Sequence, residues 1–211
     1  MIKTFLLVLA VALCVVGQTQ PNKSNTPIFR EVAGRIGLEF RHYNGMTGKF
    51  YLPEITGSGG AFLDFDNDGD LDVYLVQGNT LEPNTKPGET LFPWRGTEAP
   101  RGKLFRNDLV NKQGERRALS FTDVTEQSGI VAAGYGMGAA VGDVNNDSLP
   151  DLYLSNLGSN QMYLNKGDGK FADITKESGT DDPRWSTSAS FFDYDRDGRL
   201  DLMIVNYADF S

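Results

Sequence analysis

Short apolar stretches of four or five residues recur along the chain, and Gly, Asn or Asp residues stand at their ends. Gly and Asn tolerate the positive φ angles of tight turns, so this pattern predicts short strands separated by turns. The expected strands lie at 59–63, 72–76, 103–107, 120–124, 138–142, 152–155, 161–165, 171–175, 188–192 and 202–206. The predicted fold class is therefore all-β.

The sequence repeats itself at a period of about fifty residues. Residues 121–129 return as 171–179, and residues 143–151 return as 193–201, each pair with closely similar residues. A looser copy lies upstream, at 29–33 and 64–72. Four short strands in each period fit a blade of a β-propeller better than a coil of a β-helix or a sandwich.

The repeat predicts an incomplete propeller of about two and a half four-stranded blades over residues 28–211. Residues 28–33 resemble the last strand of a blade, and we expect them to close a final blade encoded beyond residue 211. The additional residues around 40–53 are expected to form a hairpin or loop. Residues 77–102, which include four prolines, are expected to form a long irregular loop on one rim, without a ligand.

Each period carries one aspartate-rich window of the form D-x-[D/N]-x-D-[G/S]-x-x-D between its first two strands. Calcium takes about six to eight oxygen ligands, so a tightly wound loop must point alternate side chains inward. Positions 1, 3 and 5 are expected to supply side-chain oxygens, position 7 a backbone carbonyl and position 9 a further carboxylate. The expected ligands are Asp64, Asp66, Asp68, Asp70, Asp72, Asp143, Asn145, Asp147, Leu149, Asp151, Asp193, Asp195, Asp197, Arg199 and Asp201.

These windows are not EF-hands, which need a bidentate Glu at position 12. That position is Leu75, Leu154 or Ile204 here, each inside an expected strand. In the second window Asn145 removes a charge and Ser148 replaces the turn glycine, which predicts weaker binding there. One such window can be a solvated loop, but three in register with a repeat predict about three calcium sites.

Two segments of the sequence resemble a known family of repeats. Residues 59–72 and 136–147 resemble FG-GAP and VCBS repeats, the blades of integrin-α-type propellers. Residues 29–40, followed by the segment 51–54, are similar to the start of the ASPIC and UnbV group. The resemblance implies that the chain is the N-terminal part of a seven-bladed ring with calcium in the blade hairpins. Such rings are often followed by a further C-terminal domain.

Residues 1–17 have the features of a secretory signal peptide, with Lys3 ahead of an apolar run over 5–16. That run is too short to cross a membrane core as a helix. Residues 18–27 are expected to be a linker. Cleavage would remove Cys14, the single cysteine, so the mature protein is expected to have no disulfide and no membrane span. The expected location is secreted, either extracellular or periplasmic.

The formal net charge of −8 disfavours nucleic acid as a partner, because binding to phosphates needs clustered Lys and Arg. Twelve of the 28 acidic residues lie in the three aspartate windows, so much of this acidity belongs to the candidate metal sites.

The other conspicuous residues have simpler interpretations. His42 is the single histidine and has no evident nucleophile as a partner, so it is expected at the surface or in a hairpin. Trp94 and Trp185 could stack on a sugar, although packing is the expectation for both. Tyrosines that recur in the strands are expected to pack between blades, namely Tyr74, Tyr153 and Tyr163.

Two classes of function follow. The first is a calcium-stabilised module that binds an extracellular protein or glycan, with no catalytic residues of its own. The alternative is the propeller part of an extracellular enzyme that acts on carbohydrate, with its catalytic site outside these residues. The absence of an acid/base pair in the sequence favours the first class.

Overall fold

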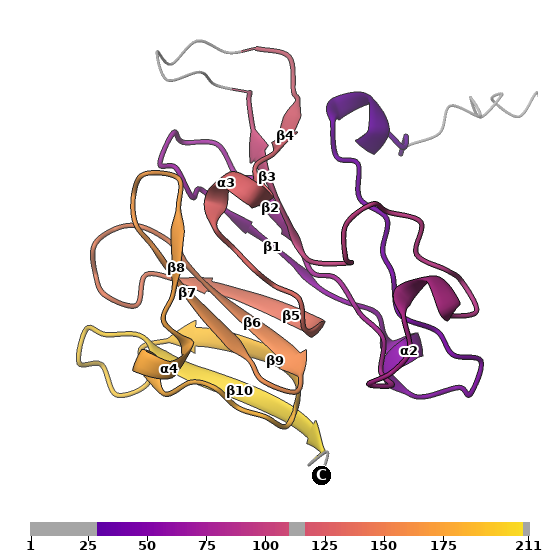
Figure 1. The fold of residues 1–211 in the computed structure, drawn as a ribbon. Coiled ribbons are helices and arrows are strands. Elements are labelled where there is room, and N and C mark those ends of the chain that lie inside the picture. Colours follow the sequence, from indigo (N-terminus) through magenta and orange to yellow (C-terminus); the bar gives the residue numbers. More distant parts are fainter. Residues whose placement is uncertain (1–28, 110–116, 209–211) are drawn as a thin grey trace, which may run out of the picture. The chain divides into compact units, whose positions relative to one another are not determined.

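The computed structural model describes residues 29–109 and 117–208. The predicted signal peptide and linker lie outside these residues. The chain divides into two compact units, Met1–Val32 and Ala33–Ser211, and every element described below belongs to the second unit (Figure 1).

The first four strands form one antiparallel sheet in sequence order. They are β1 (Gly60–Leu63), β2 (Asp72–Leu75), β3 (Lys103–Asn107) and β4 (Phe121–Asp123). In the hairpin β1–β2, Gly60 pairs with Leu75 and Leu63 pairs with Asp72, so the aspartate window is the connection between these two strands.

The next four strands repeat this arrangement in a second blade. They are β5 (Tyr135–Gly142), β6 (Asp151–Leu157), β7 (Gln161–Asn165) and β8 (Phe171–Asp173). A third hairpin follows, made of β9 (Trp185–Phe192) and β10 (Asp201–Ala208). A single residue pair, Leu157 with Trp185, joins β6 to β9, so these six strands form one hydrogen-bonded sheet.

The all-β class and the propeller-like order of strands are therefore confirmed. The bounds of β3 and β7 are those predicted, and the inner strands β5 and β9 begin three residues earlier than predicted. Two helical turns were not predicted: α3 (Thr125–Ser128) and α4 (Thr175–Ser178).

The two helical turns share one local cause. The Oδ1 atoms of Asp123 and Asp173 accept hydrogen bonds from the backbone N–H and the hydroxyl of the threonine two residues later, at 2.5–3.1 Å. Each turn ends at a glycine with a left-handed backbone conformation, Gly129 or Gly179. A short polar side chain and a glycine thus set a single turn after the last strand of each complete blade.

The predictions for three further segments have different outcomes. The strand expected at 28–33 is not present in its described residues; instead the 3-10 helix η1 (Ala33–Ile36) forms, and the Leu38 N–H donates to the Ala33 carbonyl at 2.9 Å. Residues 40–53 form a loop and no hairpin, and the short helix α2 (Pro53–Thr56) follows. Residues 77–102 form the predicted irregular loop, with one 3-10 turn, η2 (Pro87–Glu89).

The core lies between successive blades. One apolar cluster joins the first blade to the second and includes Tyr74, Leu104, Tyr163 and Phe171. Another joins the second blade to the hairpin β9–β10 and centres on Tyr153, which is fully buried. The three tyrosines are each 0–1% exposed, which confirms their predicted packing role.

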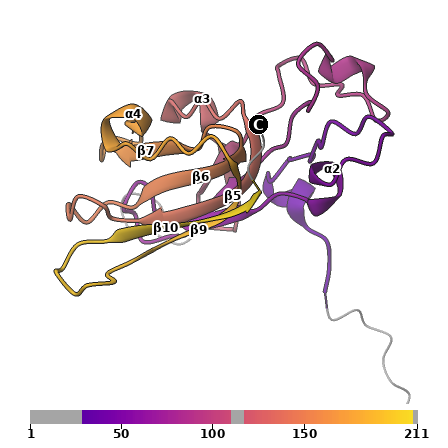
Figure 2. The same cartoon turned by 90° about the horizontal axis from the view of Figure 1, so that it is seen from below.

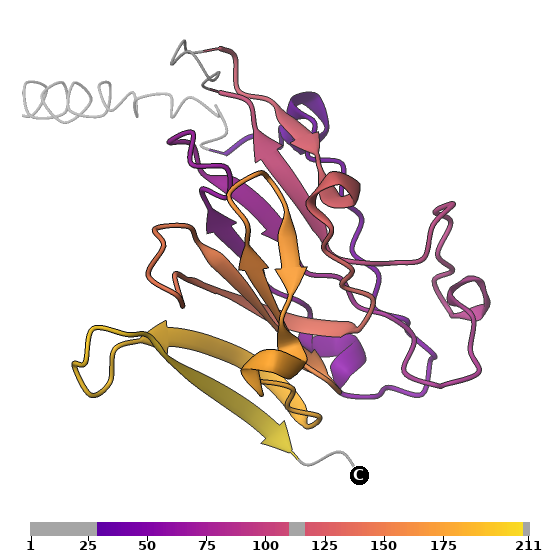
Figure 3. The ribbon, with the colours of Figure 1, turned by 60° about the vertical axis from the view of Figure 1, so that its left-hand side comes forward.

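The aspartate windows and the long loop lie at opposite ends of the strands. In Figures 1 and 3, the connections β1–β2, β5–β6 and β9–β10 extend to one side, and the loop 77–102 lies on the other with α2. Figure 2 shows β5, β6 and β7 following one another across the second blade, with α4 next to β7. None of the helices among the described residues has the length and apolar character that a membrane crossing requires.

Candidate metal centre

The three aspartate windows occupy equivalent places, each joining the first and second strands of its hairpin. We call them the first loop (64–72), the second loop (143–151) and the third loop (193–201). This equivalence was predicted from the repeat. It means that each loop connects the two strands of its own hairpin in the same way.

The backbone of the loops follows one scheme. Position 4 has a positive φ in all three, at Asn67 (57°), Asn146 (58°) and Arg196 (63°). Position 6 also has a positive φ, at Gly69 (90°), Ser148 (69°) and Gly198 (84°). The turn at position 6 was predicted from its glycines. The turn at position 4 was not, although the asparagines there were a usable signal because Asn tolerates this conformation.

The position 1 aspartate organises this backbone. Asp64 accepts hydrogen bonds at 3.0 Å from the N–H groups of Asp68 and Gly69. The same two bonds form in the second and third loops, at 2.7–3.1 Å. In each loop the position 5 carboxylate also accepts from the N–H of position 7, which is Asp70, Leu149 or Arg199, at 2.8–3.0 Å.

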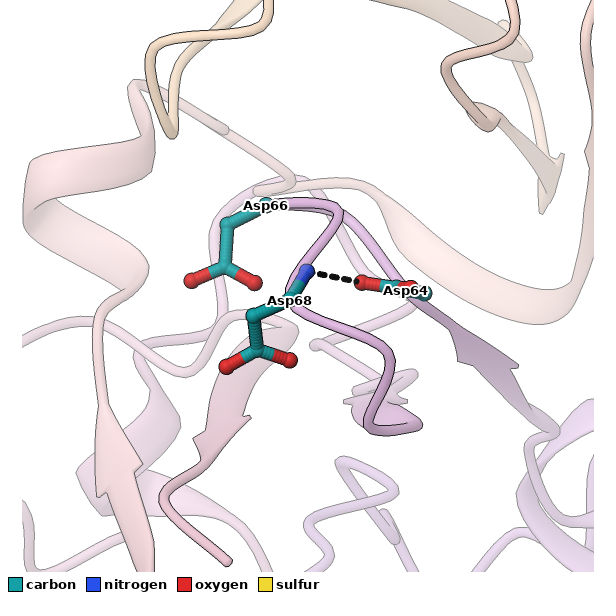
Figure 4. Close-up of side chains that lie close together, drawn as sticks. All are labelled: Asp64, Asp66 and Asp68. Carbon is teal, nitrogen blue, oxygen red and sulfur yellow. Dashed lines mark hydrogen bonds between the residues drawn. The ribbon is translucent and has the colours of Figure 1, made fainter. Parts of the chain in front are cut away.

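The first loop brings three carboxylates together (Figure 4). One oxygen from each of Asp64, Asp66 and Asp68 lies within 4.8 Å of the others, and all three side chains are half-buried. Three negative charges at this spacing repel one another by about 1–3 kcal/mol per pair for an effective dielectric constant of about 20–80. A divalent cation between them would reverse that repulsion, and carboxylate oxygens are the donors that calcium prefers.

The third loop has the same grouping, made of Asp193, Asp195 and Asp197, and all three residues are exposed. The second loop differs because Asn145 stands at position 3. Its amide donates to the Asp147 carboxylate at 2.8 Å, so one side-chain oxygen is engaged within the loop. The side-chain oxygens that the sequence predicted at positions 1, 3 and 5 thus converge in the first and third loops.

The second and third loops fall within a region that matches a known family, the FG-GAP-like repeat, over residues 143–204. The match runs from the first residue of the second loop to the middle of β10, and so spans one period of the repeat and the whole of the third loop. Residues 143–204 are therefore similar to an FG-GAP-like repeat.

The chain is also similar to cartilage acidic protein 1. It is 32% identical to the protein of Homo sapiens, 31% to that of Mus musculus and 32% to that of Xenopus tropicalis, in each case over 106 residues. These alignments cover 49% of this chain and 16% of each relative, so the chain spans a small part of their length. Both findings agree with the resemblance to FG-GAP repeats and to the ASPIC and UnbV group.

Position 9 of the three loops has a second function that sequence reasoning missed. Asp72 is fully buried and accepts hydrogen bonds from the N–H groups of Phe65 at 3.0 Å and Asn107 at 2.7 Å. Asp151 accepts in the same way from Val144 and Asn165, at 2.9 and 2.7 Å. Asp201 accepts from Tyr194 at 2.7 Å. The carboxylate at position 9 therefore ties the start of each loop to its hairpin and, in both complete blades, to the end of the third strand.

The burial of these carboxylates changes their acidity. Burial raises the pKa of Asp72 to about 7, while the N–H groups of Asn107 and Phe65 act in the opposite direction. The negative charges of Asp66 and Asp68 raise this pKa further. Burial likewise raises the pKa of Asp151. A cation bound beside Asp72 would favour its ionised form, since a nearby positive charge stabilises a carboxylate.

The first loop is also covered by the neighbouring blade. Asn165, at the end of β7, is 1% exposed, and its amide donates to the Phe65 carbonyl at 2.8 Å. The Phe65 ring lies 6.3 Å from the ring of Phe171. The two members of the hydrogen bond are 100 positions apart in the sequence, which is why no local pattern predicted it.

The remaining sequence candidates lie away from the loops. His42 is exposed, as predicted. Trp185 is 4% exposed and packs with Tyr135 and Met137, as predicted for a core residue. Trp94 is half-buried in the long loop, where its ring lies 5.7 Å from that of Tyr43.

Proposed function

We propose that this chain is part of a secreted, calcium-binding β-propeller that binds an extracellular protein or glycan and has no catalytic activity of its own. The observation that carries the proposal is the threefold recurrence of one loop geometry, with three carboxylates gathered in the first and third copies. The similarity to cartilage acidic protein 1 and the FG-GAP-like repeat supports an extracellular repeat module.

The chemistry of the loops favours calcium among common cations. Their side-chain donors are all oxygens, mostly carboxylate, as hard cations require. Zinc sites in proteins are built mainly from His and Cys ligands, and the sequence has one histidine and one cysteine. We infer about three sites, with the ligands predicted from the sequence at positions 1, 3, 5, 7 and 9.

The three sites are expected to differ in affinity. The first loop is half-buried and held by Asn165, so it loses little backbone freedom when it binds an ion. The third loop has the same carboxylates but is exposed. The second loop has one carboxylate fewer and Ser148 at the turn. We therefore expect calcium affinity to fall in the order first, third, second.

Isothermal titration of calcium into chelator-treated protein tests this proposal. About three sites are expected, and Asp66→Ala should remove the tightest one because it deletes a charged ligand from the best-ordered loop. Asn145→Ala is the matched variant at the same position of the second loop and should change total binding less. Detection of no site, or equal effects of the two variants, would contradict the proposal.

A further inference from the structure

A second candidate site lies on the first blade, at the end of its strands opposite the aspartate loops. A cleft of about 480 Å³ opens between residues 39–41, the end of the long loop and the strands β3 and β4 with α3. Trp94, Arg101, Lys103, Asp123 and Glu126 are among the residues that line it. Its volume is in the range of natural ligand pockets, roughly 300–1,000 Å³.

The long loop is built to hold Trp94 in this cleft. The Trp94 backbone N–H donates to the Pro87 carbonyl at 2.9 Å, and its indole N–H donates to the Glu98 carbonyl at 2.7 Å. Gly96 packs so closely on the ring that an added Cβ would lie 2.6 Å from it. An irregular segment of this length that nevertheless fixes one aromatic ring is characteristic of a functional loop.

Ion pairs line the cleft next to this ring. Arg101 pairs with both Glu98 and Glu126, and Lys103 pairs with Asp123 at 2.7 Å. Each pair places hydrogen-bond donors beside acceptors. The vicinal hydroxyl groups of a sugar need this arrangement, because each hydroxyl both donates and accepts.

The charges also restrict the class of ligand. Acidic residues (Glu39, Glu98, Asp123, Glu126) and basic residues (Arg41, Arg101, Lys103) nearly balance within the lining. Since the charged groups neutralise one another, the cleft offers no strong attraction for a polyanion, and the chain as a whole has a net charge of −8. From the aromatic ring, the paired donors and acceptors and this balance, we propose that the cleft binds a neutral oligosaccharide.

This inference deepens the proposed function, because it assigns the ligand class to a named surface. A second cavity, of about 640 Å³, has a different character: it is lined mainly by apolar groups, with Tyr135 and Trp185 among them. Trp94 is therefore the tryptophan that we place next to a sugar, and Trp185 the one that packs in the core.

Calorimetric titration with lactose, maltotriose and N,N′,N″-triacetylchitotriose, and with a sulfated heparin tetrasaccharide for comparison, tests the proposal. At least one neutral saccharide should bind with a dissociation constant on the order of 1 mM or lower. Trp94→Ala should weaken this binding at least about tenfold. Arg101→Gln should do the same while it leaves the contact between Tyr43 and Trp94 in place.

Phe92→Ala is the matched control, since Phe92 is an exposed aromatic residue of the same loop that does not line the cleft, and binding should be unchanged. No binding of any neutral saccharide at about 10 mM, binding of the heparin fragment alone, or equal binding by Trp94→Ala would each overturn the proposal. All variants should keep the wild-type number of calcium sites. A failure of calcium binding would thus count against the proposed function, and a failure of sugar binding against this site.

Discussion

Position 6 of the aspartate loops shows how one residue type can change a repeated site. Gly69 and Gly198 adopt a positive φ there at no steric cost, whereas Ser148 adopts the same conformation with a side chain. A left-handed conformation costs a non-glycine residue about 1–2 kcal/mol, partly offset because glycine is more flexible in the unfolded chain.

We therefore predict that Ser148→Gly raises the free energy of unfolding by about 0.5–1 kcal/mol, and that Gly198→Ser lowers it by a similar amount. The reciprocal swap isolates backbone strain, because an added Cβ at Gly198 would meet no atom within 4 Å. Urea denaturation in excess chelator measures both changes. Changes of the same sign in the two variants would show that strain at position 6 is not the cause.

Single residues also mark where sequence reasoning stops. The alternation of aspartates indicated which oxygens gather in the first and third loops, because side-chain spacing within nine residues is a local property. The same pattern could not show that the Asp72 carboxylate also accepts the N–H of Asn107, since that contact depends on how β3 lies against the β1–β2 hairpin. Arg196 at a positive φ is a further local feature that its residue type does not suggest.

At the scale of elements, the ends of the third strands offer a matched pair of residues. Asn107 and Asn165 stand at the ends of β3 and β7, and each amide donates to a carbonyl within its own blade, that of Leu71 or Pro150. Asn165 donates in addition to the Phe65 carbonyl in the first loop, and this bond crosses between blades.

We predict that Asn165→Ala lowers the free energy of unfolding by about 1–2 kcal/mol more than Asn107→Ala does, because it leaves a buried carbonyl without its donor. Asn165→Ala should also weaken calcium binding at the first loop, where Phe65 occupies position 2, and Asn107→Ala should weaken it less. Chemical denaturation and calcium titration of both variants provide the two measurements. Equal effects would mean that the bond between blades contributes nothing to the loop.

The strands themselves could be predicted well because the repeat supplied their register. Two copies of a pattern separated by fifty residues fix strand positions more firmly than either copy alone, and β4 and β8, which begin fifty residues apart, both begin within one residue of the predicted position. The helical turns α3 and α4 were missed although Asp-x-Thr recurs at the start of both, because that signal is a local hydrogen bond from the Thr to the Asp side chain and not an apolar period. The segment 28–33 was supported only by a looser copy of the repeat, and its expected strand is not present at the described residues 29–33.

At the scale of the whole molecule, calcium should act as a stabilising ligand. Each loop joins two strands and carries negative charges that repel one another. A cation that binds these charges only in the folded chain shifts the folding equilibrium towards the folded state. At a hundredfold excess over the dissociation constant, each site should add about 2.7 kcal/mol, which corresponds to about 5–10 °C in Tm for a domain of this size.

Differential scanning calorimetry in excess calcium and in excess chelator measures this shift. Magnesium at equal ionic strength is the control, since it prefers smaller octahedral sites and retains its waters. We expect calcium to raise Tm more than magnesium does. A Tm that is the same in calcium, magnesium and chelator would exclude a stabilising ion.

The division of tasks among the aspartates of each loop has a consequence for how such repeats can diverge. Positions 1 and 9 hold the backbone of the turn through N–H groups in all three loops. At position 3, the neutral Asn145 accepts the N–H of Asp147 at 3.2 Å, just as the charged Asp195 accepts that of Asp197. A copy can therefore exchange position 3 for a neutral residue, as Asn145 illustrates, and retain the architecture of its hairpin. In evolution, a loop can lose its ability to bind an ion while its blade keeps its shape. The number of blades in a protein of this kind therefore need not equal the number of ions that it carries.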